Sequence, residues 1–252
     1  MRIKSRLTNK ERDVLTPLTP ETHSRFTALV IGPAGIGKTS LLHTISPGQK
    51  VCVLSGEGGL LSVRSLLQAG TIEGWEIHSL ADFKQAYEML ATDVEMKTRY
   101  EWVFIDSLTE ISDRCVETMK SRYPSKSDSY SLWGDYADSM TALIKGFRDL
   151  SPYSVIFTCL DQVEKDELNR RYYGPAIPGR KLKDRLTSYL DEVLYMTSTK
   201  NAEGKEERVF ICHPWERYPG KDRSGKLDVF EQPDLGHIAN KILGEREEVD
   251  HE

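Results

Sequence analysis

The segment Gly32-Pro33-Ala34-Gly35-Ile36-Gly37-Lys38-Thr39 matches the phosphate-binding pattern G-x-x-x-x-G-K-[ST] at every fixed position. It follows the apolar run of residues 26–31, which is typical of a central parallel strand. Residues 38–45 predict a helix that ends at Pro47-Gly48. Glycines allow such a loop to curl until successive backbone N–H groups point inward, and the helix N-terminus adds partial positive charge. The stretch therefore predicts a phosphate cradle between a strand and a helix.

The side chains of this cradle suit ATP and Mg²⁺ as cofactors. The predicted nucleotide-binding segment runs from Gly32 to Ser40. Within it, Lys38 is expected to reach the β- and γ-phosphates, and the Thr39 hydroxyl is expected to ligate Mg²⁺. Asp106 ends the apolar run of residues 102–105, where a carboxylate is expected to hold the same ion through water.

The group that orients the attacking water has to come from another strand, because Asp106 is followed by Ser107 and not by a glutamate. Glu57 follows the strand predicted at residues 51–54, and the carboxyl ends of parallel strands share one edge of a sheet. We therefore predict Glu57 as the catalytic base. Glu110 is the second candidate, although its place one helical turn beyond Asp106 favours a solvated helix residue.

Alternating strands and helices predict an α/β fold with a mostly parallel central sheet flanked by helices. Further apolar runs predict strands at residues 102–105 and 154–158 and a long helix over residues 132–150. The β-branched and aromatic runs 192–197 and 208–213 flank a polar turn and predict a C-terminal antiparallel hairpin.

The composition restricts the class of protein. The chain has 252 residues, of which 38% are hydrophobic and 29% charged, as in ordinary globular domains. Its net charge of -5 means that contact with DNA or RNA would need a local basic strip. No apolar run approaches the roughly 18 residues of a membrane span, so no membrane contact is expected. The four cysteines are widely separated, which favours reduced thiols and a cytoplasmic location.

Residues 32–39, Glu57 and Asp106-Ser107 together resemble the RecA-like P-loop ATPase superfamily, over about residues 25–235. More narrowly, the chain resembles the short phage-encoded RecA-like ATPases that act in single-strand annealing and recombination. That narrower resemblance rests on three segments, namely Gly56-Glu57-Gly58-Gly59, residues 175–179 before a basic helix, and Lys221-Asp222-Arg223-Ser224-Gly225-Lys226.

The resemblance implies a Mg²⁺-dependent ATPase that assembles, as a ring or a filament, on single-stranded DNA and promotes annealing or recombination. A single-strand-binding or replication protein is a further candidate partner. We expect one RecA-like ATPase domain over residues 23–243, with an N-terminal arm over residues 1–22. Residues 244–252 are expected to form an acidic, flexible tail.

The resemblance also implies an active site shared between subunits. Lys221 and Arg223 resemble the Lys-x-Arg pair that RecA-like motors project from a strand into the ATP site of a neighbouring subunit. Alternate residues of a strand point to one face, so both cations can reach one phosphate site. A solvated basic turn is the alternative. For the γ-phosphate sensor of the superfamily, Gln162 and Thr158 both remain candidates.

By the same analogy, DNA-contacting loops follow the strands that end near Asp106 and Thr158. The first candidate covers residues 122–130 and the second covers residues 165–183. Cations beside aromatic side chains are typical of single-strand binding, although carboxylates interrupt the second loop and an ordinary solvated loop stays possible. Its predicted DNA-binding residues are Arg170, Arg171, Tyr172, Tyr173, Arg180 and Lys181.

Two other functions stay open at this point. A helicase-loader-like or other protein-remodelling ATPase would use the same nucleotide site. A nucleotide-kinase-like phosphotransferase would need an arginine-rich lid, for which residues 165–183 are the candidate. A module that holds ATP without turnover is disfavoured, since it has no use for a base such as Glu57.

Overall fold

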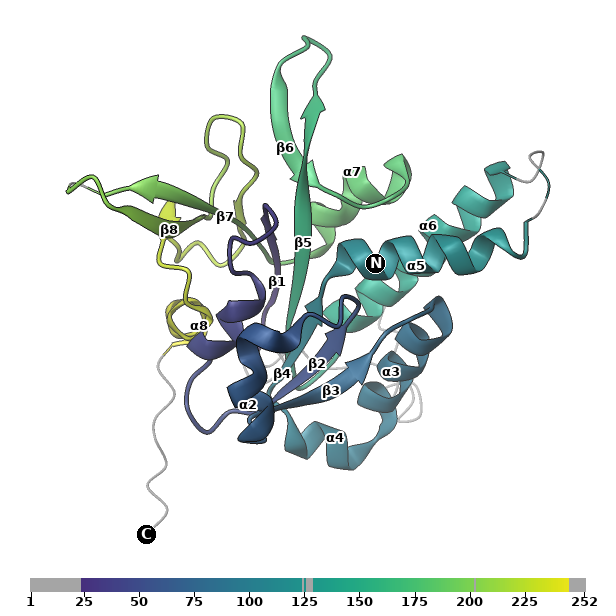
Figure 1. The fold of residues 1–252 in the computed structure, drawn as a ribbon, viewed down its shortest axis with the longest axis horizontal. Helices are drawn as coiled ribbons and strands as arrows, with labels where there is room; N and C mark the ends of the chain where they lie inside the picture. The colour runs from purple at the N-terminus through teal and green to yellow at the C-terminus, as the bar shows by residue number, and fades with distance from the viewer. Residues whose placement is uncertain (1–23, 124, 126–128, 202, 245–252) are drawn as a thin grey trace, which may run out of the picture.

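The computed structural model describes residues 24–123, 125, 129–201 and 203–244 (Figure 1). The predicted arm at residues 1–22 and residues 245–252 of the predicted tail lie outside these described residues. The functional predictions on residues 32–106 and 158–223 fall on described residues, apart from residue 202. Residues 124 and 126–128 of the first predicted DNA loop (residues 122–130) lie outside the described residues.

A ten-stranded sheet forms the centre of the fold, in the order β10-β8-β7-β1-β5-β4-β2-β3, with β6 paired to β5 and β9 paired to β7. The strands are β1 (Thr27–Gly32), β2 (Val51–Ser55), β3 (Ile72–Glu76), β4 (Trp102–Asp106), β5 (Ser154–Lys165), β6 (Arg171–Pro175), β7 (Glu192–Lys200), β8 (Glu206–Ile211), β9 (Lys221–Asp222) and β10 (Phe230–Glu231). From β7 to β3 along this order all neighbours are parallel, whereas β6, β8, β9 and β10 pair antiparallel. The predicted α/β fold, with its antiparallel C-terminal hairpin, is confirmed.

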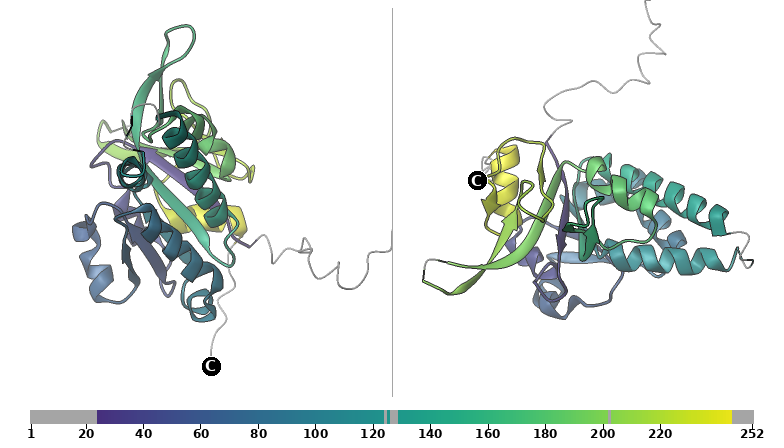
Figure 2. Two further views of the ribbon diagram at one scale, coloured as in Figure 1. Left: turned by 90° about the vertical axis from the view of Figure 1, so that its right-hand side faces the viewer. Right: turned by 90° about the horizontal axis from the view of Figure 1, so that it is seen from above.

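Helices cover both faces of this sheet, because its parallel strands carry apolar side chains on both sides (Figures 1 and 2). The helical segments are η2 (Thr39–Thr44), η3 (Leu60–Val63), α2 (Arg64–Gln68), α3 (Leu80–Thr92), α4 (Val94–Arg99), α5 (Leu108–Lys120), α6 (Ser129–Arg148), α7 (Arg180–Tyr189) and α8 (Leu235–Leu243). One core lies between the sheet and α3, α5, α6 and α7. A second core lies on the other face, against η2, η3 and α8.

The register of the parallel strands brings the predicted site together. Ser55 at the end of β2 pairs with Asp106 at the end of β4, and Gly32 at the end of β1 pairs with Leu160 of β5. The chain segments that leave these strands therefore all start at one edge of the sheet, the upper edge in Figure 1. This is the edge at which ligands bind in open α/β sheets.

Two predicted segments differ from the structure. The helix expected over residues 38–45 is a six-residue 3₁₀ helix, η2, in which the Thr44 hydroxyl bonds back to the Leu41 carbonyl. Residues 159–165 continue β5 beyond the predicted strand, and residues 171–175, within the loop predicted over residues 165–183, return as β6. This hairpin projects beyond the sheet, so its strands lack the apolar alternation that marks a half-buried strand.

None of the helices among the described residues is long and apolar enough to cross a bilayer. All four cysteines are buried and free of disulfide bonds, and burial raises the pKa of each thiol. The thiols therefore act as small apolar core groups, in line with the sequence prediction.

Candidate functional site

The phosphate loop has the shape of an anion cradle. Gly35 and Gly37 have φ angles of 76° and 103°, a region of conformation that side chains with a Cβ rarely adopt. The Lys38 ammonium is buried and donates to the carbonyl oxygens of Gly32 and Pro33, at 2.8 and 3.0 Å. Burial lowers the pKa of Lys38, while nearby carboxylates, Asp106 above all, oppose that shift. The Lys38 ammonium, held by two carbonyl groups at the start of its own loop, is therefore placed to turn towards a bound phosphate.

Asp106 lies at the centre of a buried network of hydroxyl groups. The Thr39 hydroxyl donates to Asp106 Oδ2 at 2.6 Å, and the Thr158 hydroxyl donates to Asp106 Oδ1 at 2.5 Å. Burial raises the pKa of Asp106, and these two hydrogen bonds oppose the shift. Thr158 is on β5, the strand between β1 and β4. Thr158 therefore holds the Asp106 carboxylate from the neighbouring strand β5, which continues into the projecting β5–β6 hairpin.

Glu57 lies beside this network, on the turn that leaves β2. The Ser107 hydroxyl donates to Glu57 Oε1 at 2.6 Å, and the Glu57 side chain is otherwise exposed. The turn is held close by Gly56, whose N–H donates to the Asp106 carbonyl at 2.7 Å. A Cβ at Gly56 would lie 2.8 Å from the Ile111 side chain, so the close approach requires glycine.

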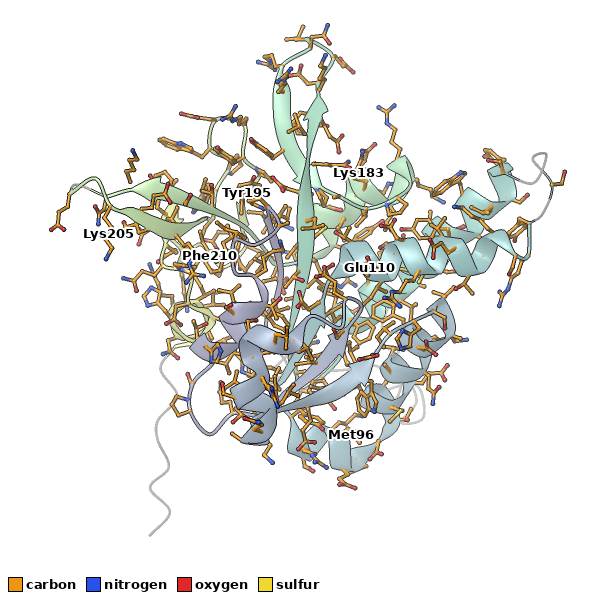
Figure 3. All side chains as sticks on the ribbon, in the orientation of Figure 1. Met96, Glu110, Lys183, Tyr195, Lys205 and Phe210 are labelled. Atoms are coloured by element: carbon orange, nitrogen blue, oxygen red, sulfur yellow. The ribbon has the colours of Figure 1, made fainter. Side chains whose placement is uncertain are left out.

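The second candidate base, Glu110, is engaged elsewhere. It lies in the first turn of α5 (Figure 3) and accepts a hydrogen bond from Arg114, one helical turn later, at 3.1 Å. Of the two carboxylates, that of Glu57 is hydrogen-bonded to Ser107, the residue after Asp106, and that of Glu110 is not.

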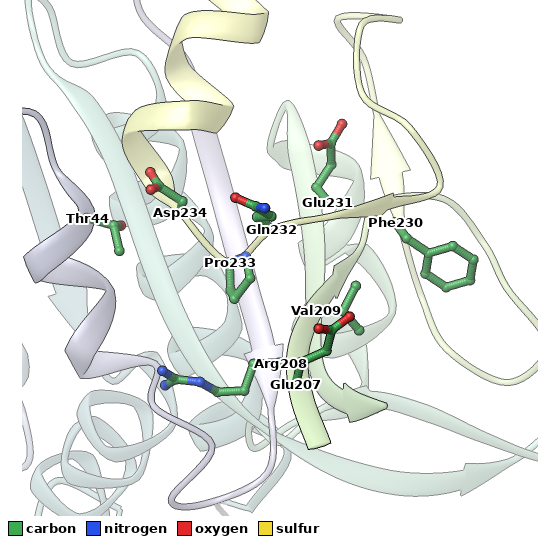
Figure 4. Close-up of a pocket in the computed structure, with 9 residues that line it drawn as sticks. All are labelled: Thr44, Glu207, Arg208, Val209, Phe230, Glu231, Gln232, Pro233 and Asp234. Carbon is green, nitrogen blue, oxygen red and sulfur yellow. The ribbon is translucent and has the colours of Figure 1, made fainter. Parts of the chain in front are cut away.

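A cavity of about 580 Å³ opens beside the phosphate loop (Figure 4). Its walls come from η2, β8 and the segment from β10 to the start of α8. The residues that line it are Thr44, Glu207, Arg208, Val209, Phe230, Glu231, Gln232, Pro233 and Asp234. Four of these residues are charged, namely Glu207, Arg208, Glu231 and Asp234, and three are apolar, so the walls are mostly polar. Because Arg208 also contacts the phosphate loop, the cavity adjoins the cradle and is the candidate site for the base and ribose of a nucleotide whose phosphates lie there.

The sequence analysis missed this cavity, because its residues come from segments far apart in the chain. It missed Arg208 for the same reason, although Arg208 contacts the phosphate loop directly, through a hydrogen bond from Nη1 to the Ile36 carbonyl. Only the pairing of β8 with β7, and of β7 with β1, brings this arginine to the loop.

Residues 24–224 match the family model described as an AAA domain. The chain belongs to this AAA domain family. Among solved structures it is similar to the flagellar accessory protein FlaH from Methanocaldococcus jannaschii, at 10% identity and a TM-score of 0.42, over 81% of this chain and 83% of that one. It is also similar to the Legionella pneumophila ATPase DotB, at 10% identity and a TM-score of 0.32, over 81% of this chain and 48% of DotB. No curated protein matches the chain in sequence.

The residues of this AAA domain fit a nucleotide with its magnesium ion. Two positive-φ glycines shape the loop, and Thr39 and Asp106 place a hydroxyl and a carboxylate oxygen 2.6 Å apart. At nucleotide sites Mg²⁺ is usually bound by only one or two oxygen ligands from the protein, and phosphate oxygens and water complete its coordination shell. When bound there, the ion would neutralise charge on the β- and γ-phosphates.

The two candidate γ-phosphate sensors take different places in the AAA domain. Thr158 is buried and bonded to Asp106. Gln162 lies four residues further along β5, where its amide donates to Glu164 at 2.8 Å. Thr158 is thus tied to the predicted metal ligand, whereas Gln162 is paired within the projecting hairpin.

Lys221 and Arg223 lie at the edge of the sheet opposite to the phosphate loop of their own chain. Lys221 pairs with Val193 near the start of β7, a strand that runs parallel to β1 and beside it. Lys221 Nζ donates to the carbonyls of Thr187 and Leu190 at the end of α7, and Arg223 forms an ion pair with Asp191 at 2.6 Å. Neither cation can therefore serve the nucleotide of its own chain in this arrangement.

A buried pair of carboxylates supports the turn that carries these cations. Glu192 is 1% exposed and pairs with Asp222 of β9 across the sheet. Within the described part of the chain, Glu192 Oε2 has no hydrogen-bond partner. Burial, and next the charge of Asp222, raise the pKa of Glu192 from 4.5 to about 8. The folded protein therefore holds a proton on Glu192 that the unfolded chain releases at lower pH.

Glu192→Gln is expected to remove a loss of stability at alkaline pH. Because the folded pKa is the higher one, the contribution of Glu192 is complete below pH 4.5 and is lost as the pH rises through about 8. Between about pH 6 and pH 9 this loss is on the order of 2 kcal/mol, or roughly 5 °C in Tm. Thermal unfolding of wild type and Glu192→Gln across this range measures it. Glu206→Gln, at an exposed site, is the control, and parallel curves for all three proteins would contradict the assignment.

The predicted DNA-binding residues separate into two groups. Arg170, Arg171 and Tyr172 belong to the β5–β6 hairpin and line one cavity of about 590 Å³. Arg180 and Lys181 instead lie in the first turn of α7, where they pair with Asp184 and Asp138. The second predicted DNA loop is therefore a hairpin followed by a helix, and it does not present its cations as one surface.

The remaining residue of this set, Tyr173, faces inward and connects the hairpin to a segment that the sequence analysis missed. Its ring stacks on Tyr218 with the centroids 5.0 Å apart, and its N–H donates to the Arg217 carbonyl at 2.8 Å. The Arg217 guanidinium lies over both rings and lines the same cavity as Arg170 and Arg171. Residues 213–220 thus form the second wall of this cavity.

Proposed function

We propose that this AAA domain hydrolyses ATP with Mg²⁺ and uses the reaction to act on single-stranded DNA, in annealing or recombination. The observation that carries the DNA part is the cavity between the β5–β6 hairpin and residues 213–220. Its lining has three arginines, Arg170, Arg171 and Arg217, and the exposed aromatic ring of Tyr172. Arginines for phosphates and aromatic rings for base stacking are the combination that single strands require.

The acidic groups of this cavity do not cancel its positive charge. Asp166 is paired with Arg170 at 2.7 Å, and Glu216 is the other lining carboxylate. Arg171 is exposed and has no ion pair among the described residues, so its charge is available to a ligand. Because the whole chain has a net charge of -5, binding to DNA requires a local basic site, and this cavity is such a site.

Strand β5 offers a physical connection between the two sites. It carries Thr158, whose hydroxyl bonds to Asp106 at 2.5 Å, and it continues without interruption into the hairpin up to Lys165. A change in the groups around Asp106 during the ATP cycle would be transmitted along this single strand. We propose that DNA and ATP bind cooperatively for this reason, with reciprocal effects on the two affinities.

A single substitution in the hairpin tests the DNA site. Arg171→Ala is expected to weaken binding of an oligothymidylate about tenfold and to lower the slope of log affinity against log salt concentration by about 1, because one phosphate contact is lost. The measurement is fluorescence anisotropy across a salt series. Arg64→Ala, an exposed arginine on α2, is the matched control and should bind as wild type does.

The outcomes separate the alternatives. Equal binding by wild type and Arg171→Ala would remove the hairpin from the DNA site. If the wild-type protein hydrolyses ATP and binds no single-stranded DNA at low salt, the proposed DNA substrate is wrong. A protein-remodelling function would then be the one to test.

We propose further that like subunits assemble and complete each other's active sites through Arg223. This residue is half-exposed at the far edge of the sheet, so only the nucleotide of another subunit is within its reach. Specific activity is then expected to rise with protein concentration, and Arg223→Ala is expected to bind ATP while losing most hydrolysis. Mixing Arg223→Ala with Lys38→Ala subunits should restore some turnover. Wild-type turnover by Arg223→Ala at every concentration would leave Arg223 a surface residue.

A further inference from the structure

Arg208 is a residue of the β7–β8 hairpin that contacts the phosphate loop with its side chain. It lies on β8 (Figure 4), opposite Ser198 of β7. Its Nη1 donates to the Ile36 carbonyl at 3.3 Å. The same Nη1 would lie 2.2 Å from a Cβ at Gly37, so the guanidinium packs directly on the backbone of the loop. The ATPase chemistry described above makes no use of this contact.

The contact has an electrostatic consequence because of the peptide unit that it involves. The Ile36 carbonyl and the Gly37 N–H belong to the same planar peptide group. A positive charge on the carbonyl oxygen polarises that group, so that its N–H becomes a stronger donor. The Gly37 N–H has no acceptor among the described residues, which leaves it free to donate to a ligand in the cradle.

The charge of Arg208 is available for this purpose. Its side chain is exposed and forms no ion pair within the described parts of the chain. Glu207, its neighbour on β8, points to the other face of the strand, because successive side chains alternate. The backbone that carries this side chain is itself fixed, because Arg208 pairs with Ser198 in the β7–β8 ladder.

We propose that Arg208 is a positioning residue for nucleotide phosphates, which acts in the same chain by polarising the Ile36–Gly37 peptide and by holding the cradle to the β7–β8 hairpin. The ligand is a nucleoside di- or triphosphate. The phosphate next to the Gly37 N–H is the group that binds more tightly, because it accepts the strengthened hydrogen bond. This inference rests on the proposed function, since it concerns the same nucleotide site. It differs from that function in assigning part of the phosphate affinity to a residue outside the loop.

The expected effect is on binding more than on turnover. The polarised N–H serves ground state and transition state alike, so Arg208→Ala should raise Kd for MgADP and KM for MgATP about tenfold, with kcat within about twofold of wild type. Inorganic tripolyphosphate is the decisive probe, because it has no base or ribose to occupy the neighbouring cavity. Its affinity should fall by the same factor. Arg208→Lys keeps the charge and should retain most of the affinity.

Lys205→Ala is the matched control. It removes a positive charge near the tip of the same hairpin (Figure 3), and within the described residues Lys205 makes no hydrogen bond or ion pair with the phosphate loop. Calorimetric titration of wild type, Lys205→Ala, Arg208→Ala, Arg208→Gln and Arg208→Lys with the three ligands measures the effect. Arg208→Gln removes the charge and shortens the side chain by about two bonds, so its affinity should fall about as far as that of Arg208→Ala.

Each outcome decides between explanations. Wild-type affinity of Arg208→Ala for all three ligands would overturn the inference while leaving the proposed function intact. Loss of ATP affinity with unchanged tripolyphosphate affinity would show that Arg208 acts on the base or ribose, through the cavity that it lines, and not on the phosphates, and would also overturn the inference. A wild-type protein that binds none of the three ligands would overturn both the inference and the proposed function. If Arg208→Ala unfolds, the ranking of glutamine against lysine provides the same test.

Discussion

Lys38→Ala is expected to abolish measurable ATP hydrolysis, a loss of at least about 10²-fold, and to weaken binding of MgATP. Lys38 is buried, and its ammonium already donates to two carbonyls of the loop, so it is positioned before any phosphate arrives. Alanine removes the only cation of residues 32–40 and leaves the β- and γ-phosphate charge without a fixed partner. Phosphate release and nucleotide titration measure the two effects.

Lys50→Ala, at an exposed position, is the control for the loss of a lysine. Its turnover should equal that of wild type. Hydrolysis at the normal rate by Lys38→Ala would show that the assigned cradle is not the active site. A contaminating ATPase is recognised because it would give the same rate in every variant.

Glu57→Gln is expected to keep the affinity for MgATP and to lower the rate of hydrolysis by about 10²-fold or more. The amide has nearly the shape of the carboxylate, and it can still accept the hydrogen bond from Ser107, which is 2.6 Å long in the wild type. It cannot accept a proton from the attacking water. The variant should therefore accumulate in its ATP-bound form, which single-turnover kinetics and retention of labelled ATP would detect.

Glu110→Gln is the matched control, since it makes the same chemical change on α5, one helical turn beyond Asp106. Because Glu110 pairs with Arg114, we expect turnover close to that of wild type. Reversal of the two results, with a slow Glu110→Gln and a normal Glu57→Gln, would transfer the catalytic role to Glu110. Ser107→Ala should have an intermediate effect, since it leaves the carboxylate present and only less well oriented.

The fold class and the positions of most central strands could be predicted from the sequence. Fully buried parallel strands leave continuous apolar runs, and β1, β2 and β4 were recognised on that basis. The β5–β6 hairpin could not be recognised, because it projects into solvent. Its strands are held by pairing with each other and by the stacking of Tyr173 on Tyr218, an interaction across 45 positions of the chain (218 − 173).

The chemistry of the cradle is determined by the sequence itself. A glycine-rich turn followed by Lys38 and Thr39 forms from consecutive residues, so local geometry suffices to direct its N–H groups, its cation and its hydroxyl to one point. The carboxylate of Asp106 follows almost as directly, because it ends a buried strand. Short-range covalent geometry decides the arrangement of residues 32–39, whereas the hydrogen bond between Thr39 and Asp106 joins residues 67 positions apart and depends on the sheet.

Other relations were decided only by the tertiary structure. The pairing of Ser55 with Asp106 brings Glu57 to Ser107, and the sheet order brings Arg208 to Gly37. The same order carries Arg223 to the edge away from its own cradle. These contacts join residues tens to hundreds of positions apart, and a register shift of one residue would turn each side chain to the other face. Nothing local in the sequence specifies them, because they follow from the simultaneous packing of both faces of one sheet.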